Sequence, residues 1–152
     1  MILGVIPARL NSTRFPSKVI FPLKGKPIIE HVYEKALQSN LLNKVIVAVD
    51  SEETKNVINC QNIIMTSDKH QSGTDRVAEV ANNFNCDIIV NIQGDEPGID
   101  PLLIDKLIQL FEDPDVEMAS IASTDLKEDD LNNDNVVTVS YTHLRAHETK
   151  AN

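Results

Sequence analysis

The chain has 152 residues, of which 41% are hydrophobic and 24% charged, values typical of a globular protein long enough to bury one proper core. Its net charge of −9 argues against DNA, RNA or an anionic membrane surface as the main partner. No hydrophobic run approaches the ~20 residues of a membrane-spanning helix, and the widely separated Cys60 and Cys86 are typical of free thiols in a reducing cytoplasm.

Hydrophobic runs and helical repeats alternate from the first residues onward. Residues 2–6 predict a buried strand, and Pro7 and Pro16 predict that a loop follows it. Hydrophobic residues at helical spacing over 29–37 predict the first helix, with Pro27 in its first turn. The remaining expected elements, in chain order, are a strand over residues 44–49, a helix capped by Ser51, a strand over 62–65, a helix capped by Thr74, a strand over 87–92, a helix that starts at Asp100 and Pro101, a strand over 117–123 and a strand over 136–139.

This alternation predicts an α/β fold of the Rossmann-like type, with a mostly parallel sheet and helices on both of its faces. Proteins of this kind bind ligands outside the carboxyl ends of their strands. Three polar loops are expected at that edge, over residues 7–18, 66–73 and 93–98, and we expect them to converge on one crevice. The chain contains neither GxGxxG nor GxxxxGKS/T, which argues against an ordinary dinucleotide site and against a Walker phosphate loop.

The loop over residues 7–18 carries three cations, Arg9, Arg14 and Lys18. Residues 1–26 contain five basic residues and no acidic one, so this segment has a charge of +5 on a chain whose net charge is −9. The planar fork of arginine and the point charge of lysine both suit phosphate oxygens. A cationic island on an acidic chain therefore predicts a small polyanionic ligand, although the charge pattern on its own fits a solvated basic loop equally well.

The other two loops add a metal-binding group and a helix start. Asp95 and Glu96 follow a buried strand, and carboxylates suit Mg²⁺, which takes one or two of them together with substrate phosphates. A plain turn is the alternative for that stretch. The third cluster consists of Gln71, Ser72, Gly73 and Arg76. Its glycine permits close backbone approach, and the helix start offers N–H donors to an anion or a base edge, so the three loops together predict a nucleoside triphosphate site.

Three stretches carry a family resemblance. They are IPAR with STR and PSK over residues 6–18, HQSGTDR over residues 70–76, and VNIQGDEP over residues 90–97. The first stretch alone indicates only the wider group of sugar-nucleotide transferases. In this order the three closely resemble the 3-deoxy-manno-octulosonate cytidylyltransferase (CMP-Kdo synthetase) family, over residues 1–139. The resemblance implies the nucleotide-diphospho-sugar transferase variety of the Rossmann-like fold.

The resemblance also implies a reaction: Mg²⁺-dependent transfer of CMP from CTP to 3-deoxy-D-manno-octulosonate (Kdo), with release of pyrophosphate, for lipopolysaccharide biosynthesis in the cytoplasm. It implies that Arg9, Lys18 and Asp95 are catalytic and that Asp95 is the ligand of Mg²⁺. It implies that Gln93 faces the sugar substrate. The residues that it implies for nucleotide binding are Ala8, Arg9, Arg14, Lys18, Gln71, Ser72, Gly73 and Arg76.

Members of that family are substantially longer, and their second half supplies further sugar-binding groups, a second metal-binding aspartate and the surface of a homodimer. We therefore expect residues 1–139 to be an incomplete, C-terminally truncated nucleotidyltransferase domain that is inactive alone and lacks most of the dimer surface. Residues 140–152 do not follow the family pattern, and we expect them to be a disordered tail. Two alternatives stay open: another cytidylyltransferase, such as one acting on sialic acid, and a CTP-binding module without catalysis.

Overall fold

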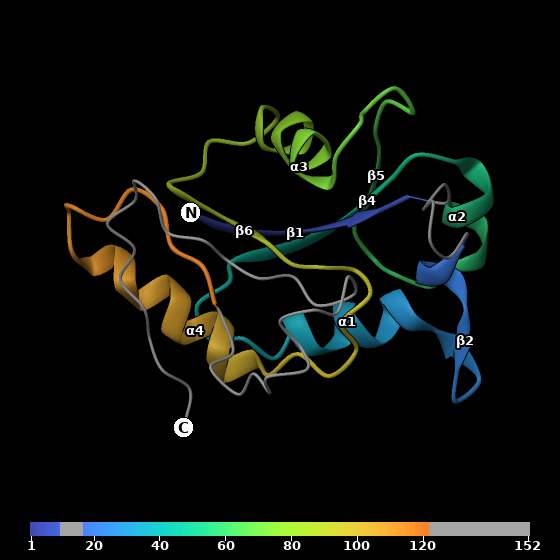
Figure 1. Cartoon of the computed structure of the whole chain (residues 1–152), viewed down its shortest axis with the longest axis horizontal. Coiled ribbons are helices and arrows are strands. Elements are labelled where there is room, and N and C mark those ends of the chain that lie inside the picture. The colour runs from blue at the N-terminus through green and yellow to red at the C-terminus, as the bar shows by residue number, and fades with distance from the viewer. Residues whose placement is uncertain (10–16, 122–152) are drawn as a thin grey trace, which may run out of the picture. The chain divides into compact units, whose positions relative to one another are not determined.

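The computed structural model describes residues 1–9 and 17–121 (Figure 1). The chain divides into two compact units, Met1–Asp105 and Lys106–Asn152, and the boundary falls within helix α4. The elements, in chain order, are β1 (Ile2–Ala8), the 3₁₀-helix η1 (Lys18–Ile20), β2 (Pro22–Leu23), β3 (Lys26–Pro27), α1 (Ile28–Ala36), β4 (Lys44–Val49), α2 (Glu52–Val57), β5 (Ile63–Met65), α3 (Gly73–Ala81), β6 (Ile88–Asn91), α4 (Pro101–Gln109) and the 3₁₀-helix η2 (Leu110–Glu112). In these ranges no helix has the length and apolar character that a membrane span requires.

The first unit is built on a parallel sheet in which β1 is central. The strand order is β5-β4-β1-β6, and β1 pairs in parallel with both β4 and β6. Val5 marks the register, because it lies opposite Ile46 of β4 and Asn91 of β6. β4 and β5 are therefore added on one side of β1, and β6 is then added on its other side. In sheets of this kind, such a reversal of the strand order places a ligand crevice outside the carboxyl ends of the two strands at the reversal, here β1 and β6.

Helices cover both faces of this sheet, as predicted. Leu3 and Val5 of β1 pack with Val77 and Val80 of α3 in one hydrophobic cluster. Figure 1 shows α1 on the opposite side of the strands from α3, where its buried residues, such as Ile29, complete the second layer. Successive side chains of a strand point to opposite faces, so a continuous hydrophobic strand such as β1 needs cover on both.

β1 extends through Pro7 to Ala8, two residues beyond the predicted end. The Val5 carbonyl oxygen accepts from the Ile92 N–H at 2.9 Å, so the odd-numbered residues of β1 turn their backbone groups toward β6. Pairing with β6 ends at Val5, and Pro7 lies beyond it. The N–H that Pro7 lacks therefore removes no hydrogen bond from the sheet, which is why a proline is tolerated in a central strand here.

Two helix starts differ from the prediction. Pro27 is not in the first turn of α1: it pairs with Pro22 in a small hairpin and precedes the helix with an extended ψ of 141°. The hairpin turn is Lys24 and Gly25, both with positive φ, the conformation that a tight two-residue hairpin turn requires. At α3 the cap is Ser72 rather than Thr74, because Ser72 and Asp75 exchange hydrogen bonds in a capping box. The predicted cap of α2 at Ser51 is confirmed by its bond from the Thr54 N–H at 3.1 Å.

The strand predicted over residues 117–123 is wrong for the part that the structure describes. Residues 117–121 of the second unit have no strand conformation, and 70% of Met118 is exposed. The hydrophobic residues there suit a strand, but a strand needs a neighbour to take its backbone hydrogen bonds, and no described strand pairs with them. Residues 122–123 and the strand predicted over 136–139 lie outside the described residues.

Candidate active site

Pro7, near the carboxyl end of β1, is the point on which two of the predicted loops pack. A Cβ added at Gly94 would lie 2.9 Å from the Pro7 carbonyl oxygen. A Cβ added at Gly73 would lie 3.3 Å from the Pro7 ring carbon Cγ. Both contacts are closer than a larger residue accepts comfortably, so the two glycines let the loops approach β1. The loops over 66–73 and 93–98 therefore meet at the end of β1, as predicted.

Arg9 is the first residue after β1, and it links the end of that strand to the start of α3. Its Nη1 donates to the carbonyl oxygen of Gln71 at 2.9 Å. A carbonyl group has no net charge, so this bond orients the guanidinium without neutralising it. Arg9 thus remains a cation that can bind an anion in the crevice.

Lys18 and Asp95 form an ion pair beyond the carboxyl end of β6. The Lys18 Nζ lies 2.7 Å from Asp95 Oδ2, and the side chains are 45% and 41% exposed. Lys18 opens η1, and Asp95 follows β6 after the tight packing at Gly94. The structure therefore brings together, from distant parts of the chain, two of the three residues that were predicted to be catalytic, and leaves both accessible to a ligand.

The other predicted site residues have different surroundings. Gln71 and Gln93 are exposed, on the loops that follow β5 and β6. Ser72 and Gly73 begin α3 beside Pro7. Ala8 is fully buried within β1, where it pairs with Val49. Arg14 lies outside the described residues, so its predicted role is a matter for experiment.

Arg76 is not gathered with the other cations. Its side chain is only 1% exposed, and its guanidinium Nη2 lies 3.1 Å from Asp50 Oδ2. Its Nη1 donates to the Thr66 hydroxyl and to the Ser67 carbonyl oxygen. Arg76 therefore connects α3 to the ends of β4 and β5. Among the described residues, its guanidinium hydrogen bonds go to these groups of the protein.

Four residues that contact Arg76 or its neighbours on the loop were not predicted as site residues: Asp50, Thr66, His70 and Glu79. Glu79 accepts hydrogen bonds from the Ser67 N–H at 3.0 Å and from the His70 ring. The Ser67 N–H and the His70 ring both lower the pKa of the Glu79 carboxyl below its usual value. The sequence does contain one signal for Glu79: it lies three residues after Arg76 on a helix, and this spacing places both side chains on one face.

The residues at the crevice fit a Mg²⁺ ion that arrives with a phosphorylated ligand. The described residues contain no group of three side chains able to hold a metal. Mg²⁺, however, usually takes one or two carboxylates and completes its shell with phosphate oxygens and water. The half-exposed carboxylate of Asp95 supplies one such ligand, and Arg9 and Lys18 supply charge for the phosphates.

Comparison with known proteins identifies relatives of this chain. The chain is 47% identical over 125 residues to the 3-deoxy-manno-octulosonate cytidylyltransferase of Trichlorobacter lovleyi, over 80% of this chain and 50% of that protein. It is 43% identical over 141 residues to the enzyme of the same name from Geobacter metallireducens, over 91% of this chain and 56% of that one. The solved structure of CMP:2-keto-3-deoxy-manno-octonic acid synthetase complexed with CTP matches with a TM-score of 0.75 at 41% identity, over 79% of this chain and 51% of that chain. The chain thus spans about half the length of these relatives.

A sequence profile of cytidylyltransferases matches residues 3–149. The match covers the described elements from the second residue of β1 onward and extends past residue 139, into the segment that was expected to be a tail outside the family pattern. That boundary stays a prediction. The parallel sheet, the loops that meet at the end of β1 and the extent of this match lead to one conclusion: the chain belongs to the cytidylyltransferase family.

Proposed function

We propose that this chain forms the nucleotide-binding half of a 3-deoxy-manno-octulosonate cytidylyltransferase. The reaction is the transfer of CMP from CTP to Kdo, with release of pyrophosphate, and we assign it to lipopolysaccharide synthesis in the cytoplasm. The observation that carries the proposal is the Lys18–Asp95 pair, in which Asp95 follows β6, together with Arg9 directly after the neighbouring strand β1. The similarity to curated enzymes of that name supports the choice of substrates.

In this proposal the protein positions the reactants and stabilises charge. Arg9, Arg14 and Lys18 hold the triphosphate, and Gln93 faces the sugar. Asp95 would hold Mg²⁺, and a bound Mg²⁺ would neutralise charge on the phosphate oxygens. The residues that place the nucleotide are Ala8, Gln71, Ser72, Gly73 and Arg76, of which Arg76 acts through the loop that it holds.

The chemical step is a displacement at phosphorus. The anomeric hydroxyl oxygen of Kdo forms a bond to the α-phosphorus of CTP and loses its proton. The bond from that phosphorus to the bridging oxygen breaks, and pyrophosphate leaves. No covalent enzyme intermediate is required, so the rate depends on how well the two substrates are aligned.

The Lys18–Asp95 pair is suited to the arrival of a Mg²⁺–triphosphate. In the ligand-free protein each side chain neutralises the other. The ligand would supply Mg²⁺ to Asp95 and phosphate oxygens to Lys18. Asp95 would then exchange one positive partner for another, and Lys18 one negative partner for another. Because both side chains are about half exposed, breaking this pair costs little, about 1 kcal/mol or less.

We infer that the 152-residue chain binds CTP but does not complete synthesis. The relatives are about twice as long, and we assign the remaining sugar-binding groups, a further metal-binding aspartate and the homodimer surface to the part that has no counterpart here. On this view the domain over residues 1–139 is incomplete.

The test measures binding and turnover on the same sample. Calorimetry with Mg²⁺ and CTP is expected to show binding by the 152-residue chain, while an assay of pyrophosphate release with CTP and Kdo is expected to show none. A version in which the second half of a related enzyme replaces residues 140–152 is expected to turn over with Kdo and not with sialic acid. Absence of CTP binding would overturn the proposed site. Turnover by the 152-residue chain alone would overturn its incompleteness.

A further inference from the structure

Two side chains of helix α3 form hydrogen bonds with the backbone of the preceding loop. Arg76 and Glu79 lie three residues apart and therefore on the same face of the helix. Glu79 accepts from the Ser67 N–H at 3.0 Å, and Arg76 Nη1 donates to the Ser67 carbonyl oxygen at 3.4 Å. Both backbone polar groups of one loop residue are thus bonded to side chains of the following helix.

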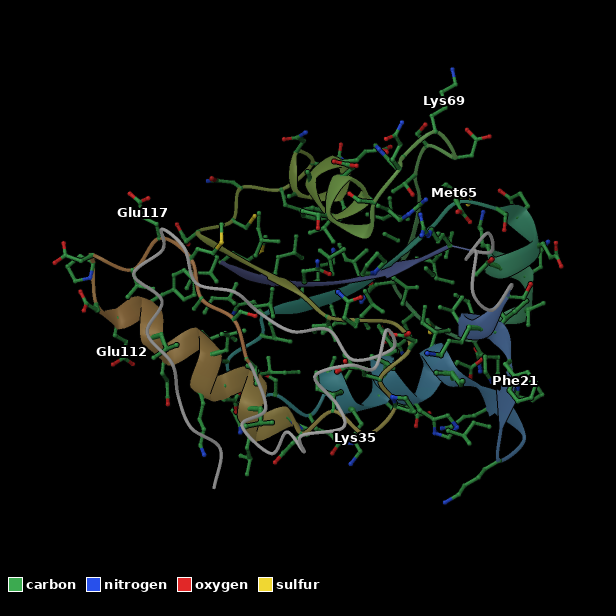
Figure 2. All side chains as sticks on the ribbon, viewed as in Figure 1. Phe21, Lys35, Met65, Lys69, Glu112 and Glu117 are labelled. Carbon is green, nitrogen blue, oxygen red and sulfur yellow. The ribbon has the colours of Figure 1, made fainter. Side chains whose placement is uncertain are left out.

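His70 extends the same contact toward the site. Its ring Nε2 bonds to Glu79, so that Glu79 holds the loop at two points, Ser67 and His70. Between these points the loop is a projection: Asp68 and Lys69 are exposed, and Figure 2 shows Lys69 extending away from the molecule. The bonds from Glu79 therefore fix where the loop returns to α3.

The residue that follows His70 is Gln71, whose carbonyl oxygen orients Arg9. A chain of contacts consequently runs from Glu79 through His70 and the Gln71 backbone to the Arg9 guanidinium. Ser72, the next residue, is fixed independently by its capping box with Asp75. The Gln71 carbonyl thus lies between a fixed helix start and the bond from His70 to Glu79, and its direction depends on both.

We propose that His70 and Glu79 are positioning residues for Arg9. This inference rests on the proposed role of Arg9 in triphosphate binding. Neither side chain touches the nucleotide: together they hold the Gln71 carbonyl so that Arg9 points into the crevice. The carboxyl of Glu79 supports the geometry, because the bonds from Ser67 and His70 lower its pKa and so favour the ionised form that accepts both bonds.

The first experiment needs no ligand. In the 152-residue chain, ¹⁵N relaxation of the Arg9 Nε–Hε group reports the order of the guanidinium, and hydrogen exchange reports the amides of the loop. In His70→Ala and Glu79→Ala we expect faster Arg9 motion, and in Glu79→Ala at least tenfold faster exchange at the Ser67 amide, since the Ser67 N–H is bonded to that carboxylate. The variant His31→Ala is the matched control, because His31 bonds to the Leu23 carbonyl in the hairpin and not to this loop.

The second experiment separates phosphate recognition from base recognition. In His70→Ala we expect the affinity for Mg²⁺–CTP to fall about tenfold, as for loss of a bond to a charged group, and the affinity for cytidine to stay within about twofold. His70→Gln offers an amide N–H in place of the ring N–H, and it is expected to restore most of the CTP affinity. Arg76 is not a suitable test position, because its side chain is buried and its loss endangers the fold.

Each outcome is decisive. Unchanged Arg9 order and loop exchange in both variants would overturn the positioning role, whether or not the chain binds CTP. Equal losses for CTP and cytidine would also overturn it, because they would indicate a general effect on the loop. If wild-type chain binds no nucleotide while Arg9 loses order as expected, the proposed function fails and the positioning of Arg9 by His70 and Glu79 stands.

Discussion

At the scale of single residues, Pro7 joins the parts of the site. Its carbonyl oxygen faces Gly94 and its ring faces Gly73, so loops from the ends of β5 and β6 pack on the end of β1. In this arrangement the position of Asp95 depends on how closely Gly94 approaches β1.

A substitution at Gly94 tests that dependence. Gly94→Ala places a methyl group 2.9 Å from the Pro7 carbonyl oxygen, so the loop has to move outward and carry Asp95 with it. We expect a loss of about 1–3 kcal/mol in the free energy of unfolding, as for overpacking, and weaker binding of Mg²⁺–CTP. Chemical denaturation and calorimetry measure the two effects. Gly98→Ala is the control, because nothing lies within 4 Å of its added Cβ, and equal effects of the two changes would contradict the argument.

Asp95 itself gives the second prediction at this scale. In a version completed with a family second half, Asp95→Asn removes the proposed ligand of Mg²⁺ and is expected to lower kcat on the order of a hundredfold or more. The fold should be unaffected, because the bond that Asp95 makes to Lys18 is half exposed. Steady-state kinetics over a range of Mg²⁺ concentrations checks this. Near-normal kcat with unchanged Mg²⁺ dependence would show that another group holds the metal.

At the scale of elements, Asp105 ties α4 to the connection between α1 and β4. Its carboxylate accepts from the Ser39 hydroxyl, from the Asn40 N–H at 3.2 Å and from the Leu41 N–H at 3.3 Å. Burial alone would raise the pKa of the Asp105 carboxyl, but the bonds from Ser39, Asn40 and Leu41 together lower it below its usual value. The backbone donors of this connection are thus satisfied by a side chain from α4.

This pKa shift predicts how stability depends on pH. A carboxyl whose pKa is lower in the folded than in the unfolded chain stabilises the fold above its unfolded value of ~4, and this contribution is lost as the pH falls through the folded value. We expect Asp105→Asn to lower the free energy of unfolding at pH 7 by about 1.5–3 kcal/mol, and by less at pH 3. Denaturation at both pH values measures the difference. Asp68→Asn, at an exposed loop position, is the control, and a pH-independent loss in Asp105→Asn would contradict the assignment.

The elements also show what the sequence can and cannot predict. β4 was predicted with its correct bounds, since its hydrophobic run is bounded by Lys44 and Asp50. β1 was predicted too short, because the tolerance of Pro7 depends on where pairing with β6 ends, and pairing is not local. Lys18 and Asp95 were predicted as site residues, and their 2.7 Å approach follows from the strand order. Glu79 was missed, because its partners Ser67 and His70 lie on a loop whose path sequence patterns do not define.

At the scale of the whole chain, β1 is the first strand in sequence and lies inside the sheet. Its two neighbours are completed only at Val49 and at Asn91. We expect a chain ended after residue 87 to lack a stable fold, since β1 would then have one bare edge and the Gly94 loop would be absent. Circular dichroism and thermal unfolding of chains ended at residue 87 and at residue 121 compare the two cases. A cooperative transition in the shorter chain would show that β6 is dispensable.

The position of β1 has a consequence for how the protein is made. On a ribosome that adds about 5–20 residues per second, β1 leaves the exit tunnel seconds before β6 is synthesised. Until β6 follows, a strand with the hydrophobic sequence Ile2–Ile6 lacks its partner on one side. The exposed edge of β1 can then pair with strands of other chains. Slow translation of the codons between residues 50 and 91 is therefore expected to increase aggregation. Co-expression of a chaperone that binds extended segments is expected to decrease it.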